Sequence, residues 1–494
     1  MSTRYDRVIR EVEIYDGTGG APLVGDLALD GDAIVAVGVV DGGGARTIDG
    51  RGLAAAPGFI DVHTHDDFAA VLYPDLSFKV AGGVTTCLVG NCGLGAAPFP
   101  AAARMARTFH PRAVLPEWQG YAGYVAHLAG APPAANIGVL IGHGTARLAV
   151  MGSSRVSPSA ADMAALKAVV AEGLDAGALG LSSGLIYSPG CLAETGELIE
   201  LATLLRGTGA LYTTHLRDEG AGLLDAMREA VAIGTAAGVP VQISHHKASG
   251  RAAWGLVESS LRLIEESRAA GLEICADQYP YTAGSTVLSA IFRDGRFDSG
   301  IGVLEADDVV VASADGHREW EGQSIAAIAT TLGTTTSAAA ELVLAAQPET
   351  TVIVHSMREE DVQTVMRHPT TMIGSDGIPT IDGRPHPRLY GTFARVLGRY
   401  ARELGVLSLA EAVHRMTGLP AATFGLERRG LLRAGYAADL VLFDPARIAD
   451  CGTFEDPHRH PVGIAAVFVN GVQVRDASGS TGARPGRVLR RRGA

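Results

Sequence analysis

The stretch Gly58-Phe-Ile-Asp-Val-His-Thr-His65 places two histidines at the end of a short apolar run. Side chains two positions apart on a strand point to the same side, so His63 and His65 can face one ion beyond the strand. Two packed or solvated histidines would produce the same pattern, and the motif alone does not distinguish the two interpretations. The pattern of strands and helices after this motif distinguishes them.

After this stretch, short apolar runs alternate with helical ones, which is the pattern of strand-helix-strand units in a parallel sheet. The runs that resemble buried strands are 58–63, 85–89, 137–141, 178–181, 210–215, 239–244, 273–277 and 371–375. The helical runs between them are 159–175, 195–208, 222–237 and 256–270. The sequence therefore predicts an α/β fold, a (β/α)₈ TIM barrel with its site at the carboxyl ends of the strands.

The two ends of the chain contain short strand-like runs that are separated by glycine-containing turns. These runs are 5–9, 11–15, 26–29, 34–38, 438–443, 465–469 and 471–474. We expect residues 1–57 and 427–494 to pair into a small β-sandwich outside a barrel domain of residues 58–426. A long insertion at about 285–350, with a further strand-like run at 351–355, is suited to form a lid or a substrate wall.

Composition narrows the class of protein. The net charge of -12 over 494 residues argues against a nucleic-acid-binding protein, which needs a basic face. We interpret the one basic segment, Arg484–Arg492, as a solvated terminus. Five cysteines without regular spacing favour a reducing cytoplasm over a disulfide framework. No secretory signal or membrane-spanning run is evident, so we expect a cytoplasmic protein that acts on a small molecule, with a homo-oligomer among the options.

Four further reactive residues follow predicted strands: Cys92 the second, His215 the fifth, His245 the sixth and Asp376 the eighth. Each has an ordinary interpretation, since a free cysteine is usually a small buried hydrophobe and Asp before Gly is a common turn pair. Because the carboxyl ends of barrel strands meet at one face, these side chains are expected to converge. Histidine and thiolate ligands favour Zn²⁺. We therefore predict a zinc site formed by His63, His65, Cys92, His215 and His245.

A metal site of this kind predicts a hydrolase. Zinc lowers the pKa of bound water to about 7 and so provides a nucleophile at neutral pH. Asp376 is expected to accept a proton from that water and to pass it to the leaving nitrogen of an amide. His143, His246 and His355 also follow apolar runs, and we interpret them as packing or supporting residues.

With these residues identified, the sequence resembles the amidohydrolase superfamily and, more closely, the N-acyl-D-amino-acid deacylases, or D-aminoacylases. The superfamily signals are 58–65, the single histidines of strands five and six, Asp376 and 438–444. The closer signals are Gly90-Asn-Cys-Gly93, Gly180-Leu-Ser-Ser-Gly-Leu-Ile-Tyr187, Ile243-Ser-His-His-Lys247, Asp277-Gln-Tyr-Pro-Tyr-Thr-Ala-Gly-Ser285 and His386-Pro-Arg388. The resemblance extends from about Tyr5 to Gly471.

The resemblance implies how the ligands are used. Many two-metal amidohydrolases bridge their ions with a carboxylated lysine on strand four, but this strand reads Ala178-Leu-Gly-Leu-Ser-Ser-Gly184. In the D-aminoacylases a cysteine matching Cys92 takes the bridging place. One zinc is held tightly by the residues matching Cys92, His215 and His245, and a second, looser site uses those matching His63 and His65.

The resemblance also implies a clamp for the substrate carboxylate, formed by Lys247, Tyr279 and Arg388. Such a clamp is chemically reasonable because arginine offers two parallel donors to a carboxylate. The preference for the substrate side chain is not determined by these motifs. An acidic side chain would need an additional cation, for which Arg293 and Arg296 of the insertion are candidates.

The sequence thus predicts a zinc-dependent amidohydrolase that cleaves N-acyl-D-amino acids into a carboxylate and a free D-amino acid. Two alternatives remain open. One is a related hydrolase of a cyclic amide, another small amide or a dipeptide, although the missing strand-four lysine argues against the cyclic amides. The other is a non-catalytic binding barrel, which would be expected to lose ligands or Asp376, whereas all are present.

Overall fold

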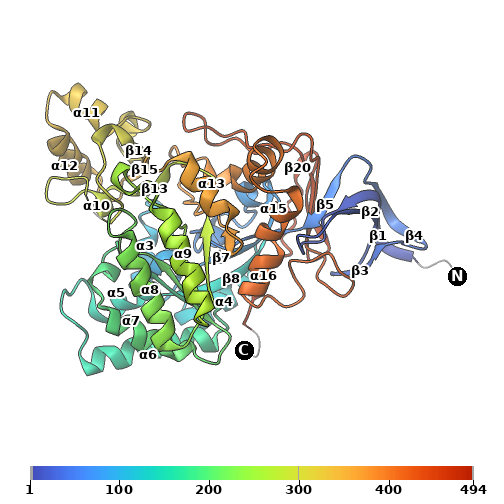
Figure 1. Cartoon of the computed structure of the whole chain (residues 1–494), viewed down its shortest axis with the longest axis horizontal. Coiled ribbons are helices and arrows are strands. Elements are labelled where there is room, and N and C mark those ends of the chain that lie inside the picture. The colour runs from blue at the N-terminus through green and yellow to red at the C-terminus, as the bar shows by residue number, and fades with distance from the viewer. Residues whose placement is uncertain (1–3, 299, 492–494) are drawn as a thin grey trace.

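The computed structural model describes residues 4–298 and 300–491 and has a parallel barrel at its centre (Figure 1). Its strands are β6 (Phe59–Asp61), β7 (Val84–Val89), β8 (Asn136–Gly142), β9 (Gly180–Gly184), β10 (Leu211–His215), β11 (Val241–Ile243), β12 (Ile274–Gln278) and β16 (Thr371–Ile373). They pair in the order β16-β12-β11-β10-β9-β8-β7-β6, and a parallel bridge between Thr64 and Gly377 joins the two outer strands. The predicted (β/α)₈ fold is confirmed.

Helices and loops cover the barrel strands, and every one of the strand residues is buried. The helices are α1 (Ala69–Leu72), α2 (Ser77–Val80), α3 (Phe99–Ala106), α4 (Gly120–Gly130), α5 (His143–Met151), α6 (Ala160–Asp175), α7 (Thr195–Ala202), α8 (Leu223–Ala237), α9 (Leu256–Ala269), α13 (Glu359–Arg367), α14 (Arg388–Arg395), α15 (Leu409–Met416) and α16 (Gly418–Thr423). A capping box between Ser159 and Asp162 starts α6. Helix α7 is shorter than predicted and continues only as a 3₁₀ turn, Thr203–Leu205.

The two ends of the chain form one nine-stranded sheet at one end of the molecule (Figure 1). Its strands are β1 (Arg4–Ile14), β2 (Leu23–Asp30), β3 (Ala33–Gly38), β4 (Gly43–Asp49), β5 (Ala54–Pro57), β17 (Leu440–Phe443), β18 (Ile464–Val469), β19 (Val472–Asp476) and β20 (Gly479–Ser480). Strand β17 pairs with β5, so the predicted pairing of the two ends is confirmed. The domain boundaries at 57 and 427 stay a prediction.

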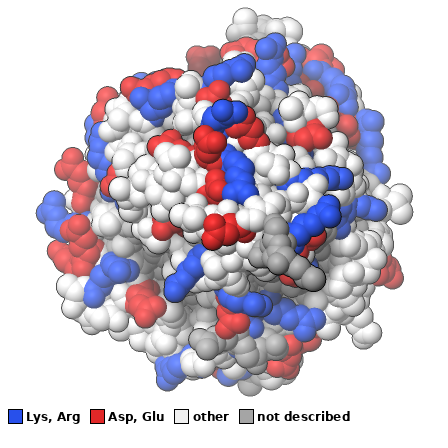
Figure 2. Space-filling view, turned by 90° about the vertical axis from the view of Figure 1, so that its right-hand side faces the viewer, with Lys and Arg blue, Asp and Glu red and all other residues white. Residues whose placement is uncertain are grey.

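The surface at this end of the molecule carries a mixture of charges. Acidic and basic side chains are intermixed over the face that Figure 2 shows. This agrees with the net charge of -12. Within the described ranges, no helix is both long and apolar enough to cross a bilayer.

The insertion has its own small sheet and core. Strands β13 (Gly284–Val287), β14 (Val309–Ser313) and β15 (Thr351–Val354) pair antiparallel in the order β13-β15-β14. Helices α10 (Leu288–Ile291), α11 (Ile325–Leu332) and α12 (Thr336–Ala346) complete it, opposite the nine-stranded sheet (Figure 1). The predicted extra strand at 351–355 is therefore the central strand of this unit.

Within the described part of 484–492, Arg484, Arg487 and Arg490 are exposed, as the prediction of a solvated basic terminus expects, but the segment is also anchored to the barrel. Strand β21 (Val488–Leu489) pairs with barrel strand β8, and the Arg491 guanidinium donates to the carbonyls of Leu174 and Thr208. Backbone groups at this end of the barrel need hydrogen-bond partners, and the terminal segment provides them. Arg492 lies outside the described residues.

Candidate active site

The predicted ligands converge at the carboxyl ends of the barrel strands. Three overlapping sets have ligand atoms within 4.8 Å of one another: His63 with His65 and Cys92, Cys92 with His215 and His245, and His63 with His245 and Asp376. The Cys92 Sγ atom is central, at 3.3 Å from His63 Nε2, 3.4 Å from His245 Nε2 and 3.8 Å from His215 Nδ1. Imidazoles, a thiol and a carboxylate at this spacing fit a borderline-soft ion such as Zn²⁺.

Cys92 lies in a single 3₁₀ turn, Asn91–Gly93, directly after β7. Its backbone is left-handed, with a φ of 54°, a costly conformation that is concentrated at functional sites. Burial raises the pKa of its thiol, but His63 and His245 act in the opposite direction and hold the pKa of Cys92 well below its usual range. The thiolate, which is the form that binds metal, is therefore favoured.

Asp277 on β12 orients two of the histidines, a role that the sequence did not reveal. His63 Nδ1 lies 3.3 Å from Asp277 Oδ1, and the backbone N–H of His245 donates to the same oxygen at 2.9 Å. A carboxylate on Nδ1 leaves Nε2 of His63 free for a metal. The position of Asp277 at the end of the seventh predicted strand was the sequence signal that could have indicated this role.

Glu219 supports His245 in a similar way and was also missed. Its Oε1 lies 3.0 Å from His245 Nδ1 and accepts a hydrogen bond of 2.6 Å from Lys247 Nζ, while Lys247 Nζ is itself 2.8 Å from His245 Nδ1. A carboxylate only accepts and an ammonium only donates. The His245 tautomer that frees Nε2 for a metal therefore donates from Nδ1 to Glu219.

The charge of Glu219 is also fixed by its neighbours. Burial raises the pKa of Glu219, but Lys247 and the two histidines His215 and His245 outweigh this effect and lower it below its ordinary value. The carboxylate is thus ionised while buried. It follows His215 by four residues in a loop without any recognisable pattern, so no sequence signal pointed to it.

Asp376 follows β16 in a left-handed conformation, with a φ of 49°. Its Oδ1 lies 3.2 Å from His65 Nε2 and 3.5 Å from His63 Nε2, and its Oδ2 lies 2.9 Å from Arg388 Nη2. Burial raises the pKa of Asp376, yet Arg388 and the neighbouring histidines hold it well below its usual range. Asp376 is therefore an ionised carboxylate that adjoins the ligand cluster.

Lys247, Tyr279 and Arg388 lie together on one side of the cluster. The ring centroid of Tyr279 is 4.4 Å from the guanidinium carbon of Arg388 and 5.7 Å from Lys247 Nζ. Within the part of the chain that the structure describes, Tyr279 Oη and Arg388 Nε and Nη1 are buried without a hydrogen-bond partner. Buried free donors of this kind suit an anionic group such as a carboxylate.

The cluster opens into a cleft of about 1060 Å³. His65 and Asp376 line it together with Tyr187 from the segment after β9 and Thr286 from β13, so the insertion provides one of its walls. Of the two candidate cations in the insertion, Arg293 lines the cleft.

The three histidines that were expected to pack or to support the site have structural contacts. His246 Nε2 lies 2.8 Å from Ser260 Oγ, and His143 Nε2 lies 2.8 Å from Glu197 Oε1. The ring of His355 packs edge-on against Phe454, with 4.9 Å between the centroids. These contacts agree with the packing and supporting roles expected for them.

Comparison with known proteins places these features in a family. A sequence model described as "Amidohydrolase family" matches residues 46–475. A D-aminoacylase of Alcaligenes xylosoxydans xylosoxydans is 40% identical, over 99% of this chain and 98% of that protein. From the same organism, an N-acyl-D-aspartate deacylase is 41% identical (98% and 95% covered) and an N-acyl-D-glutamate deacylase 39% identical (99% and 98% covered).

Solved structures give the same result. The N-acyl-D-glutamate deacylase from Bordetella bronchiseptica, complexed with zinc and a phosphonate mimic of the tetrahedral intermediate, has a TM-score of 0.89 and 37% identity, over 99% of this chain and 100% of that one. A D-aminoacylase described as having a binuclear metal centre, with one-metal activation and second-metal attenuation, has a TM-score of 0.87, 37% identity and the same coverage. The structure of an L-hydantoinase from Arthrobacter aurescens has a TM-score of 0.61 and 16% identity, over 99% of this chain and 100% of that one. At this identity the similarity shows a common fold alone.

Proposed function

The chain belongs to the amidohydrolase family, and on this premise we propose that it is a zinc-dependent deacylase that hydrolyses N-acyl-D-amino acids. One observation carries the proposal: the ionised Asp376 adjoins the ligand cluster on one side and, through its 2.9 Å ion pair with Arg388, the free donors of Arg388 and Tyr279 on the other. A metal site and a carboxylate-binding site side by side are what an N-acyl amino acid requires.

The metal ligands are assigned as follows. Cys92, His215 and His245 would hold the tighter zinc, and Cys92 with His63 and His65 would hold a looser second one. The D-aminoacylase relative with a binuclear centre supports two sites of unequal importance. Zinc, when bound, polarises the acyl carbonyl and makes hydroxide available at neutral pH.

Asp376 carries the proton during the reaction. It accepts a proton from the attacking water as the water oxygen bonds to the acyl carbon. The C–N bond then breaks, and Asp376 returns the proton to the leaving nitrogen. The products are a carboxylate and a free amino acid.

The substrate carboxylate binds to the free donors. Arg388 Nε and Nη1 and Tyr279 Oη have hydrogen atoms available, and Lys247 adds positive charge at 5.7 Å from the Tyr279 ring centroid. This clamp fixes the α-carbon relative to the metal ligands and so selects one enantiomer. We assign the D form because the three similar deacylases act on N-acyl-D-amino acids by name.

The rival functions have less support. Strand β9 carries no lysine that could bridge two metals, which argues against the cyclic-amide hydrolases. A non-catalytic barrel would have no need for the complete ligand set together with Asp376. A different small amide or a dipeptide stays the nearest alternative. We also propose the cytoplasm as the location, since the five cysteines are free thiols.

The test is hydrolysis of paired N-acetyl-D- and N-acetyl-L-amino acids (Met, Leu, Glu and Asp) by the zinc-loaded protein. We expect release of D-amino acids alone. In Asp376→Asn, kcat should fall by about 10²–10⁴-fold, because the amide cannot accept the proton.

The outcomes separate the candidates. Release of L-amino acids at equal rates would contradict the assigned enantiomer. Inactivity on all D substrates would redirect the search to cyclic amides and dipeptides. Inactivity there as well would favour the non-catalytic interpretation.

A further inference from the structure

A second, much smaller cavity lies beside His65. It has a volume of about 20 Å³ and is lined by residues that include His65, Asp67, Phe109 and His110. One water molecule needs about 10–15 Å³ and two to four polar partners. The cavity is therefore large enough for a single water.

Three residues that line this cavity each carry a polar atom without a partner. Among the described residues, His65 Nδ1, Asp67 Oδ1 and His110 Nε2 are buried and have no hydrogen-bond partner. The three residues are only 7%, 5% and 5% exposed, so bulk solvent does not satisfy these atoms. Buried polar groups are almost always hydrogen-bonded, and three at one small cavity point to a common partner.

The orientation of His65 explains which of its nitrogens is involved. Its Nε2 lies 3.2 Å from Asp376 Oδ1, toward the ligand cluster and the main cleft. Nδ1 is on the other edge of the ring and is the nitrogen left for the small cavity. The metal-ligating histidines of proteins usually donate their second ring N–H to a carboxylate, a carbonyl or a water.

We propose that one water molecule binds between His65 Nδ1, Asp67 Oδ1 and His110 Nε2 and orients His65 for the looser metal site. His65 Nδ1–H donates to the water oxygen, and the water donates its two hydrogens to the carboxylate and to His110 Nε2. Each of these three atoms then has a partner. Asp67 and His110 are positioning residues in this arrangement, which rests on the metal site of the proposed function and not on the substrate.

His110 is suited to accept this hydrogen bond. Burial lowers its pKa to about 4, so the ring is neutral at physiological pH and keeps one unprotonated nitrogen. His63 and His245 have Asp277 and Glu219 as partners for their second nitrogens. The water would give His65 an equivalent support.

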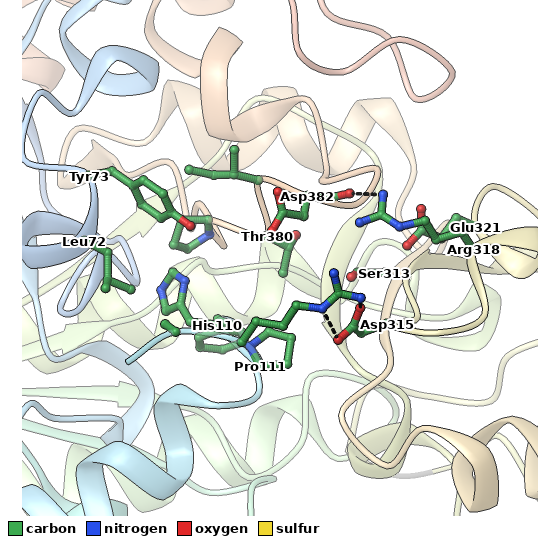
Figure 3. Close-up of a pocket in the computed structure, with 15 residues that line it drawn as sticks. Leu72, Tyr73, His110, Pro111, Ser313, Asp315, Arg318, Glu321, Thr380 and Asp382 are labelled. Atoms are coloured by element: carbon green, nitrogen blue, oxygen red, sulfur yellow. Dashed lines mark hydrogen bonds and ion pairs between the residues drawn. The ribbon is translucent and has the colours of Figure 1, made fainter. Parts of the chain in front are cut away.

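A loop between α3 and α4 brings His110 to this position. The same loop forms part of an outer pocket of about 240 Å³, in which His110 lies near Tyr73 (Figure 3). On the same loop Arg112 forms an ion pair with Asp315 of the insertion. Arg112 lines the outer pocket but not the inner cavity, which makes it a matched control for changes at His110.

The experiment is a zinc titration of the metal-free full-length protein against a chromophoric chelator, which measures both sites without any substrate. For His110→Phe, we expect the looser site to weaken by about 10-fold or more, with less than about 3-fold change at the tighter site. His110→Gln, whose amide can bond the water, should retain most of the wild-type affinity. Arg112→Ala should leave both sites unchanged. Asp67→Asn provides a second variant at the cavity.

Several outcomes would overturn the proposal. Equal weakening of both sites in His110→Phe, or the same loss in Arg112→Ala, would indicate a general effect of the loop. An unchanged looser site in both His110→Phe and Asp67→Asn would exclude the water bridge. Because deacylase activity is not measured here, a failure of the proposed substrate would not affect this result.

Discussion

At the scale of single residues, the site combines reactive side chains with costly backbone. Cys92, His245 and Asp376 have φ values of 54°, 35° and 49°, in the left-handed region. Each such residue costs on the order of 1–3 kcal/mol, which the surrounding packing must offset. Buried carboxylates then fix the histidine tautomers, and so the chemistry depends on partners that are not themselves ligands.

Glu219→Gln tests the importance of these partners. The amide is similar in size to the carboxylate but is a weaker acceptor for His245 Nδ1–H, and it leaves the Lys247 charge without its partner at 2.6 Å. We expect the affinity of the tighter zinc site to fall by about 10–100-fold. The measurement is the same chelator competition. Wild-type affinity in this variant would show that Glu219 does not support His245.

His110 gives a pH dependence of stability. Burial lowers its pKa to about 4, against 6.5 in the unfolded chain, so only the unfolded chain takes up a proton between these values. The stabilisation is fully present above pH 6.5 and is lost as the pH falls toward 4, by about 3 kcal/mol in total.

Thermal unfolding of the wild type and His110→Gln at pH 7 and pH 5 measures this effect. The wild type should lose more stability than the variant on acidification, by about 2 kcal/mol at pH 5. Parallel losses in both proteins would assign the acid sensitivity to other groups.

At the scale of elements, the Cys92 turn is fixed by strand β9. A side chain at Gly184 would bring its Cβ to 2.1 Å from the Cys92 carbonyl oxygen, so this strand has to carry a glycine where the turn contacts it. The position of the central sulfur therefore depends on a neighbouring strand as well as on its own.

Gly184→Ala should displace the Cys92 turn. We expect at least a 10-fold loss of zinc affinity at the tighter site, together with lower activity, because ligand geometry would change. Gly196→Ala is the matched control, since a Cβ there meets nothing within 4 Å in helix α7. The control should be neutral or more stable by about 0.5–1 kcal/mol. Full zinc affinity in Gly184→Ala would show that the turn can shift without consequence.

At the scale of the whole molecule, a buried lysine helps to close the barrel. Lys79 Nζ donates to Asp61 Oδ2 at 2.7 Å, to Thr64 Oγ1 at 2.8 Å and to Ser375 Oγ at 2.8 Å, and Asp66 Oδ2 is 3.3 Å away. These residues belong to the segments of the first and last barrel strands. The network thus joins the two edges of the sheet.

Lys79→Met should destabilise the protein by about 3–5 kcal/mol, because buried Asp61 loses its cationic partner. Lys167→Met is the control. Its ion pair with Glu200 is exposed, with side-chain exposures of 39% and 49%, and is expected to contribute about 0–1 kcal/mol. Chemical unfolding monitored by circular dichroism measures both changes. Similar losses in the two variants would contradict a closing role for Lys79.

The sequence by itself determined the barrel and the identity of its reactive residues. The alternation of short apolar runs with helical runs can be found without coordinates, and few side chains other than histidine and cysteine are suited to hold zinc. Placing Cys92 and His215 at strand ends was enough to predict that they converge, because the fold brings all strand ends to one face. The structure confirmed that convergence, while the roles of the individual ligands stay proposals.

The supporting residues were decided only by the tertiary structure. His63 and Asp277 are 214 positions apart, and Lys79 and Ser375 are 296 apart, so no local spacing relates them. Asp, Glu and Lys are common on protein surfaces, and only burial beside a partner gives Asp277, Glu219 or Lys79 a role. The same reason applies to Arg491, whose acceptors, the carbonyls of Leu174 and Thr208, lie 317 and 283 positions away in the sequence.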